Sequence, residues 1–312
     1  MPRGMLQLIV PGFGRPWPDG IERPATESLD LLLARSDRLA GGVGYAEILF
    51  DLFKVPEASR VTTPFCWKAL TGEAPKRWVM HADPVHLRAD RDRLLLFDLP
   101  AGVVPPQEAR HFAGAFNEHF SADGLTLHIL APAYWFIALD ARPGARFTPL
   151  DRALDMPLDE AMPTGPEADR WRQLMNEVQM LFFQLPVNRE REERGQLTVN
   201  GLWFSEPGRV MESPKVAPRL LSAVEDPLLQ GLMDCAEKGD TDDQLLVFDT
   251  LERAFNQQDS RALVTAMQRL DTQVGTLLQQ KLELRLQDCN GTGWHWKPAM
   301  KWRFWRRVRP LA

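Results

Sequence analysis

Short apolar runs alternate with amphipathic helix patterns along most of this chain, and this alternation restricts the fold more than any other feature. The runs have the length and composition of buried strands, and they include residues 5–10, 94–97, 197–204 and 245–248. Between them, apolar residues recur every three or four positions, as on one helix face, over residues 106–120, 167–185 and 260–278. Strands that alternate with helices predict an α/β fold with a mostly parallel sheet flanked by helices.

The middle of the chain interrupts this alternation. Residues 125–130 and 135–139 are two expected strands with a short connection between them, which favours an antiparallel pair. Residues 143–165 carry four prolines and two glycines and are expected to form a loop at a domain seam. We therefore expect a main α/β domain over residues 1–75 and 166–312, and an inserted smaller α+β subdomain over residues 76–165.

Composition narrows the class of protein. The 312 residues are 44% hydrophobic, which suffices for a substantial core, and the net charge of −5 argues against nucleic-acid binding by bulk charge. The cysteines Cys66, Cys235 and Cys289 are far apart and are expected to be reduced thiols. The apolar runs are too short to span a membrane. We therefore expect a cytoplasmic protein without a membrane span.

The densest polar segment is residues 81–93, HADPVHLRADRDR. In an extended strand alternate residues share a face, so His81 and Asp83 point to one side and His86 and Arg88 to the other. This separation argues against a metal site within the segment. Arg88 or Arg91, with His86 beside it, could build an anion or phosphate site. The alternative is a strand end whose surface charges neutralise one another, and the spacing alone favours that alternative.

Two asparagines, Asn188 and Asn200, flank a charged loop in the segment LPVNREREERGQLTVNGLW. Asparagines at the ends of helices and strands usually satisfy backbone groups in turns. The alternative is that both face one pocket together with Trp203. The run NREREER is expected to be the solvated end of a helix.

Known catalytic motifs are incomplete in this sequence. The first expected strand ends in VPGFG, but the pattern G-x-G-x-x-G fails and no Walker lysine follows. Neither a G-x-S-x-G elbow nor an H-E-x-x-H pair is present. The residues therefore predict no familiar catalytic site and no cofactor.

The C-terminal segment from Trp294 combines four tryptophans with six lysines and arginines and has no acidic residue. Aromatic residues between basic ones suit stacking on bases, or binding to an acidic or membrane surface. In that case the partner-binding residues are Trp302, Arg303, Trp305, Arg306 and Arg307. The alternative is that the tryptophans cover an edge of the core and the arginines pair with the acidic body, as an alternating strand over residues 302–305 would allow.

Three blocks of the sequence resemble a known family. HADPVHLRADRDRLLLFD, NEVQMLFFQLPVNREREERGQLTVNGLWF and the closing FWRRVRP are similar to the RpfE family of bacterial regulatory proteins. That family is similar in layout to archaeal-type cofactor-independent phosphoglycerate mutases of the alkaline phosphatase superfamily. The resemblance implies an alkaline-phosphatase-like sheet. In the mutases it also implies an Asp-Gly metal-binding turn, a serine or threonine nucleophile and a late Asp-His cluster that holds two metals.

The chain departs from this pattern where metals would bind. Its first strand ends in Pro11-Gly12 without the aspartate, and Asp288 and His295 are the only, and weak, matches to the late cluster. Two-metal phosphoryl transfer depends on the carboxylates and histidines that hold both ions. Polar residues remain in the regions that resemble the phosphoglycerate site.

These observations lead to three functional hypotheses. The first is a non-catalytic regulatory or ligand-sensing protein that binds a phosphorylated small molecule or another anion. Its pocket would be lined by Asp83, His86, Arg88, Arg91, Asn188, Asn200 and Trp203. The second is a divergent, metal-dependent phosphoglycerate mutase or phosphatase. The third is an adaptor that binds a protein or nucleic acid through the basic C-terminal segment.

Overall fold

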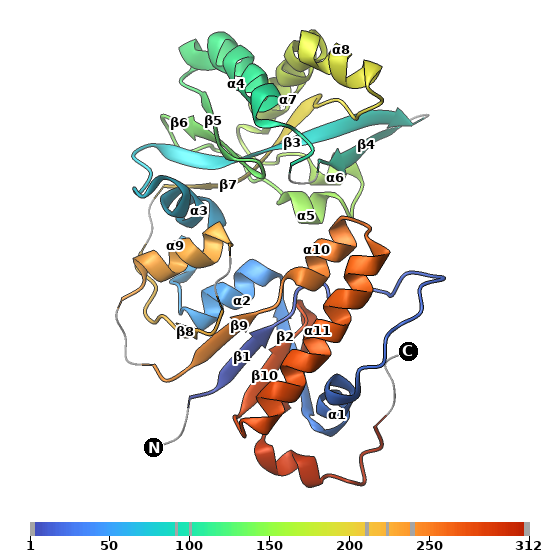
Figure 1. Cartoon of the computed structure of the whole chain (residues 1–312). Coiled ribbons are helices and arrows are strands. Elements are labelled where there is room, and N and C mark those ends of the chain that lie inside the picture. The colour runs from blue at the N-terminus through green and yellow to red at the C-terminus, as the bar shows by residue number, and fades with distance from the viewer. Residues whose placement is uncertain are drawn as a thin grey trace. The chain divides into compact units, whose positions relative to one another are not determined.

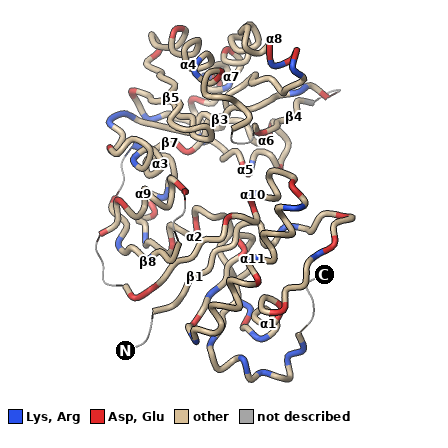
Figure 2. The backbone as a smooth tube through the Cα atoms, in the orientation of Figure 1, with Lys and Arg blue, Asp and Glu red and all other residues tan. Residues whose placement is uncertain are grey.

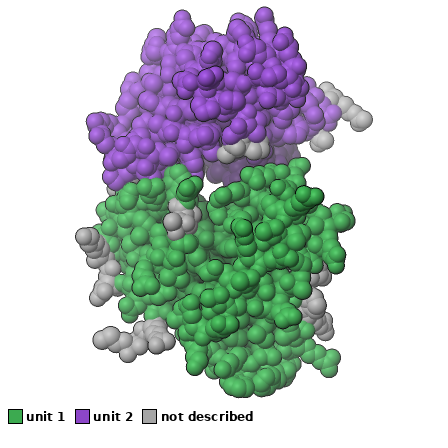
Figure 3. Space-filling view, viewed as in Figure 1, with its two compact units in different colours: residues 1–60, 212–312 green, residues 61–211 purple. Residues whose placement is uncertain are grey.

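The computed structural model describes residues 4–90, 93–99, 102–209, 212–222, 225–237 and 241–308 (Figure 1). The chain divides into two compact units, which Figure 3 colours separately: unit 1 comprises residues 1–60 and 212–312, and unit 2 comprises residues 61–211. The expected insertion, residues 76–165, lies within unit 2. Unit 2 is longer at its C-terminal end because β7 (Gly201–Gly208) pairs with β3 (Trp78–Asp90) in its sheet.

Unit 1 contains a mixed sheet with the order β2-β11-β10-β1-β9-β8 among the described residues. The strands β10 (Leu284–Gln287), β1 (Leu6–Ile9), β9 (Gln244–Val247) and β8 (Arg219–Leu220) are parallel. The strands β11 (Asn290–Trp296) and β2 (Asp37–Val43) add to it in antiparallel fashion. All four residues of β1 are buried, as expected of a central parallel strand.

The helices of unit 1 supply the apolar side chains that cover this sheet. Leu263, Leu270 and Leu277 on α11 pack in one core with Leu6 and Leu8 of β1, as the helical spacing predicted. The helices are α1 (Glu27–Arg35), α2 (Tyr45–Leu52), α9 (Pro227–Cys235), α10 (Thr250–Asn256) and α11 (Ser260–Gln279), with 3-10 turns η1 (Glu57–Ser59) and η3 (Pro298–Trp302). The predicted α/β fold with a mostly parallel sheet flanked by helices is confirmed in unit 1.

Unit 2 is built on an antiparallel sheet. Within the described residues its order is β4-β3-β6-β5, and β7 also pairs with β3. The remaining strands are β4 (Arg93–Asp98), β5 (Thr126–Ala131) and β6 (Tyr134–Leu139). The antiparallel pairing of β5 with β6 confirms the prediction for that part of the chain.

Helices lie on both sides of the unit 2 sheet (Figure 1). On one side, Phe112 of α4 and Phe182 of α7 join Met80 and Ala82 of β3 in the main core. On the other side, Val85 and Trp203 pack with the short helices α5 and α6. The bounds of these helices are α3 (Thr62–Thr71), α4 (Pro106–Phe120), η2 (Ser121–Asp123), α5 (Leu150–Ala153), α6 (Leu158–Ala161), α7 (Ala168–Phe183) and α8 (Pro186–Glu193). Of the helices described in either unit, none has the length and apolar character needed to cross a membrane.

Candidate functional site

Four polar side chains of unit 2 meet beside the start of α3, and we call them the His81 cluster: Thr62, His81, Asp83 and Glu206. His81 and Asp83 stand two residues apart on β3 and therefore share the face that the alternation predicted. Thr62 is the first residue of α3, and Glu206 lies on β7. The side chains of His81, Asp83 and Glu206 retain 13%, 19% and 27% exposure, so the cluster is largely enclosed but keeps some contact with solvent.

A β-bulge places Glu206 in this cluster. Val79 pairs with Gly208 and His81 pairs with Ser205, so β7 has one residue more than β3 over this stretch. Glu206 has a φ of 50°, in the left-handed region that residues other than glycine seldom adopt. The hydroxyl of Thr63 holds this backbone by donating to the Glu206 carbonyl oxygen at 2.7 Å. Bulges of this kind often redirect a side chain toward a functional site.

The hydroxyl of Thr62 connects the histidine to the carboxylate. It donates a hydrogen bond to Glu206 Oε2, and His81 Nε2 lies 3.1 Å from the same hydroxyl oxygen. Because the hydroxyl proton is directed at Glu206, the imidazole is placed to donate from Nε2. Nδ1 then has its lone pair on the side of Asp83, whose Oδ1 is 3.9 Å away and beyond hydrogen-bonding distance.

Burial shifts the pKa values of Asp83 and His81 in opposite directions. Burial, together with the smaller effect of the nearby acids Glu206 and Asp151, raises the pKa of Asp83 to about 8. Burial lowers the pKa of His81 to about 4, because the charged imidazolium is poorly solvated there. Near neutral pH Asp83 therefore keeps its proton and His81 is uncharged. The cluster offers hydrogen-bond donors and acceptors beside the carboxyl group of Glu206.

The predicted anion-pocket residues lie at several places in unit 2. Asn188 is buried, and its amide bonds to the Phe182 and Val199 carbonyl oxygens and to the Val199 amide, at 2.8–3.0 Å. The amide of Asn200 bonds to the backbone N–H and carbonyl of Leu87 at 2.6 and 2.7 Å. Both side chains thus complete backbone hydrogen bonding, as asparagines beside turns commonly do.

His86 and Arg88 are brought together on one face of β3. Nδ1 of His86 lies 3.0 Å from the Thr198 carbonyl oxygen, and the guanidinium of the exposed Arg88 lies 4.9 Å from the centre of the Phe97 ring. The His86 ring is 6.2 Å from the same Phe97.

Asp83 and Trp203 lie on the opposite face of the sheet from this pair. They are direct neighbours across β3 and β7, and the indole of Trp203 donates to the Thr148 carbonyl oxygen at 2.8 Å. The structure therefore does not bring the predicted residues into a single pocket. Arg91 lies outside the described residues.

The two weak metal candidates are engaged in the hairpin of β10 and β11. Oδ1 of Asp288 accepts hydrogen bonds from the amides of Asn290 and Thr292 at 2.8 and 2.9 Å, which closes the turn. His295 lies near the other end of β11, with its Nε2 2.6 Å from Glu283 Oε1. In the part of the chain that the structure describes, no group of three or more His, Cys, Asp or Glu side chains is arranged to hold a metal ion.

The basic C-terminal segment combines features of both predicted alternatives. Arg303 and Arg306 bind the carboxylate of Asp37 at 2.5–3.2 Å, which lowers the pKa of that carboxyl group. By contrast, Trp302 and Trp305 are exposed. The alternating strand expected over residues 302–305 is absent among the described residues, because the 3-10 turn η3 and further turns occupy this stretch.

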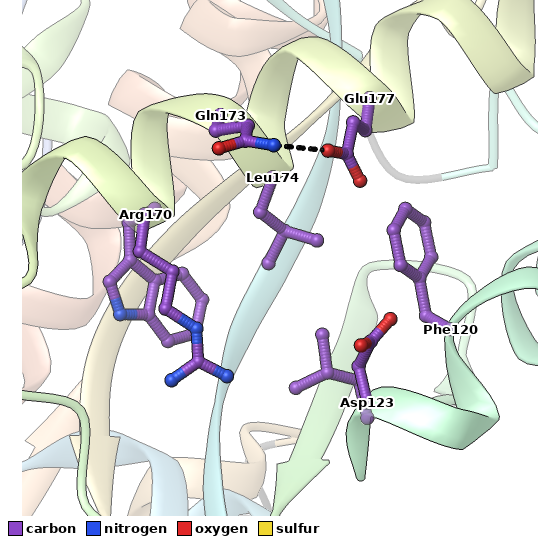
Figure 4. A pocket seen from close by; sticks show the side chains of 8 residues that line it. Phe120, Asp123, Arg170, Gln173, Leu174 and Glu177 are labelled. Carbon is purple, nitrogen blue, oxygen red and sulfur yellow. Dashed lines mark hydrogen bonds between the residues drawn. The ribbon is translucent and has the colours of Figure 1, made fainter.

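A shallow hollow beside α7 holds about 180 Å³ (Figure 4). Arg170 and Asp123 lie on its rim and are exposed, and Gln173 donates to Glu177 at 2.8 Å. The lining residues are Phe120, Asp123, Leu125, Arg170, Trp171, Gln173, Leu174 and Glu177. None of these residues belongs to a predicted site.

Comparison with known proteins gives structural similarity only. The chain matches no protein-family model and no curated protein. Its fold is similar to that of the PH0037 protein from Pyrococcus horikoshii, with a TM-score of 0.51, 14% identity, and coverage of 95% of this chain and 88% of that one. A cofactor-independent phosphoglycerate mutase from Thermoplasma acidophilum DSM 1728 is a more distant neighbour, with a TM-score of 0.39, 15% identity, and coverage of 95% and 90%. The first similarity concerns the fold alone, and the second carries no functional argument.

Proposed function

We propose that this chain is a non-catalytic, ligand-sensing regulatory protein related to the RpfE family, and that the His81 cluster is its ligand site. The observation that carries the proposal is the position of Glu206. A bulge and a left-handed backbone hold its carboxyl group close to His81 and Thr62, in an enclosed site where it raises the pKa of Asp83.

This arrangement costs folding free energy, and the cost supports a functional role. Backbone strain and a pKa raised by burial and like charge both destabilise the folded state at neutral to alkaline pH. A hydrophobic residue or an amide would avoid the charge repulsion at the same position. Perturbed ionisable groups gather at ligand and catalytic sites more often than elsewhere in a protein.

The chemistry of the cluster supports binding rather than nucleophilic catalysis. A Thr-His-Asp triad needs an imidazole basic enough to accept the hydroxyl proton and an ionised carboxylate that orients it. Here the pKa of His81 is about 4 and that of Asp83 about 8, which is the reverse of that requirement. The hydroxyl of Thr62 also donates to Glu206 rather than to the imidazole.

The donors and acceptors of the cluster suit a ligand with hydroxyl or ammonium groups. An ammonium group would be attracted by the carboxyl group of Glu206 and would favour ionisation of Asp83. A phosphorylated ligand fits the opposite face better, where Arg88 is exposed beside His86. Anion binding on that face remains a separate part of the proposal.

Thermal unfolding with chemically distinct probes tests both parts. We would compare putrescine, glycerol and glycerol 3-phosphate at millimolar concentration, because a ligand of the folded state raises the melting temperature by mass action. Putrescine or glycerol should stabilise the wild type and Arg88→Ala but not Glu206→Gln. Glycerol 3-phosphate should stabilise the wild type but not Arg88→Ala. The exposed Glu118→Gln is the matched control and should respond like the wild type.

Two results would contradict the proposal. One is a melting temperature that none of the probes changes, or that changes equally in the wild type and in Glu206→Gln. The other is turnover of p-nitrophenyl acetate or p-nitrophenyl phosphate that Thr62→Val abolishes, because the hydroxyl would then act as a nucleophile.

A further inference from the structure

The end of the described chain exposes large apolar side chains, which we call the C-terminal aromatic patch: Trp302, Phe304, Trp305 and Val308. Their exposed fractions are 60%, 65%, 76% and 42%. Trp302 and Phe304 contact each other edge to face with ring centres 5.7 Å apart. Single exposed apolar residues are common, but a sequence-local group of aromatic residues marks an interaction surface.

The segment that carries the patch is held to unit 1 by a buried side chain and by hydrogen bonds. Met300 is buried in the core of the unit, and the guanidinium of Arg303 binds both the Asp37 carboxylate and the Arg35 carbonyl oxygen. Arg306 adds hydrogen bonds to Asp37 and to the Ser36 carbonyl oxygen. The aromatic side chains are therefore presented from a fixed segment, which lowers the conformational entropy lost on binding.

The surroundings of the patch are cationic. Lys301 Nζ lies 4.8 Å from the Trp302 ring centre, and the Arg35 guanidinium lies 5.1 Å from that of Phe304. Lys301 and Arg307 are exposed, and Figure 2 shows basic residues spaced along this stretch of unit 1. Asp37, the acid that meets this segment, is already bound by two arginines. The charge that remains is complementary to an anionic partner.

We propose that the C-terminal aromatic patch binds the surface of an anionic phospholipid bilayer. Indole and phenyl rings beside lysine and arginine suit the boundary between headgroups and acyl chains, where the rings enter and the cations contact phosphate groups. This inference is independent of the ligand proposed for the His81 cluster.

Two observations favour a lipid surface over nucleic acid. Binding of single strands depends on bases that stack on open aromatic faces. Here cations already lie over two of the three aromatic rings of the patch, those of Trp302 and Phe304. In addition, residues 296–308 contain no hydroxyl, amide or carboxylate side chain, so base edges would be contacted mainly by lysine and arginine, which bind phosphate groups equally well. Aromatic, aliphatic and cationic side chains alone are the composition of an interfacial anchor.

Vesicle co-sedimentation of the full chain tests this surface. We would use vesicles of phosphatidylcholine alone and of phosphatidylcholine with phosphatidylglycerol. The wild type should pellet with the anionic vesicles, less so at high salt, and the double variant Trp302→Ala/Trp305→Ala should lose about tenfold or more in partition coefficient. The single variant Trp305→Ala, at the most exposed ring, should lose less and keep the wild-type melting temperature. Phe183→Ala on α7, where the ring is 74% exposed, is the matched control and should bind like the wild type.

The outcomes separate cleanly. Loss in the tryptophan variants with retention in Phe183→Ala supports the proposal, provided that Trp305→Ala melts like the wild type. Three results overturn it. The wild type stays in solution with anionic vesicles, the tryptophan variants bind as well as the wild type, or the chain binds a single-stranded oligonucleotide while ignoring both kinds of vesicle.

Discussion

Unit 2 encloses ionisable side chains at two places, and their surroundings act on them in opposite ways. At the first, the wholly buried Arg191 of α8 binds Glu108 of α4 at 2.5 Å, and Arg194 binds the other carboxylate oxygen at 2.6 Å. Arg191 also donates to the Leu197 carbonyl oxygen at 2.8 Å. At the second, the His81 cluster, two acids lie near an uncharged histidine.

The difference between these places distinguishes structural charges from functional ones. Opposite charges and backbone carbonyls at Arg191 hold two helices and the chain before β7 together, so the fold explains them. At the His81 cluster the nearby acid and the strained backbone both oppose folding. A buried ionisable group whose charge its surroundings compensate is a structural element, whereas one whose charged form its surroundings disfavour calls for a function.

The largest expected effect comes from breaking the compensated pair. Glu108→Ala should lower the free energy of unfolding by about 3–5 kcal/mol, because Arg191 would remain buried without a counter-charge. Urea denaturation measures this loss. Glu237→Ala, which removes the exposed pair of Glu237 with Lys215, should cost less than about 1 kcal/mol. Equal losses in Glu108→Ala and Glu237→Ala would contradict the view that the buried Arg191–Glu108 pair is a structural element of the fold.

The second effect is a pH dependence that originates in Asp83. The pKa of this acid is raised in the folded state, so the folded protein holds a proton that the unfolded chain releases. Stability should fall as the pH rises from about 6.5 to about 8, by up to about 1.4 kcal/mol per pH unit for one proton. Below pH 6.5 the lowered pKa of His81 acts in the opposite direction down to about pH 4.

Denaturation at a series of pH values tests this sign. Asp83→Asn imitates the protonated acid and should remove the decline between pH 6.5 and 8. A variant that declines as steeply as the wild type would assign the effect to another group.

A smaller effect should follow from relieving the charge repulsion. Glu206→Gln should stabilise the protein at neutral to alkaline pH by about 1 kcal/mol and lower the pKa of Asp83, while the response to putrescine or glycerol is lost. Carboxyl carbon NMR titration follows the pKa directly. A Glu206→Gln variant that is more stable but still responds to putrescine or glycerol would contradict the proposed role of the cluster, because the carboxyl group would then destabilise the fold without contributing to binding.

The last prediction is that a divalent metal has no effect on stability. Added Mn²⁺ should leave the melting temperature unchanged, because Asp288 is engaged in its hairpin turn and His295 in its contact with Glu283. A metal-dependent rise would instead favour the phosphomutase hypothesis.

The sequence predicted features that depend on local spacing. The stripe on α11 and the shared face of His81 and Asp83 both follow from the period of the backbone. Features that depend on distant partners were not predicted. The helix α1 stops at Arg35, because residues 37–43 pair with β11, far along the chain. The run NREREER, expected to be solvated, contains the buried Arg191, since its partner Glu108 lies 83 positions away.

Only part of the His81 cluster could be predicted from the sequence, again because its members lie far apart in the chain. Thr62 and Glu206 are 144 residues apart, and a bulge that the alternation of side chains does not reveal brings them together. The acid in FSEPG, near the end of a mostly apolar strand, was the available signal. A carboxylate in such a strand needs a partner, and its identity required the pairing of β7 with β3.

The position of β1 also determines the order in which the protein is completed during synthesis. Its neighbours β9 and β10 begin at Gln244 and Leu284, so both sides of this strand stay unpaired while more than two hundred residues are translated. At ordinary ribosomal speeds this interval is roughly ten to fifty seconds. Unit 2, which is continuous in sequence, emerges complete within that time. In the nascent chain, the apolar strand β1 therefore stays unpaired on both sides while unit 2 is completed. A chaperone that covers residues 5–10 would protect this strand until β9 and β10 are synthesised.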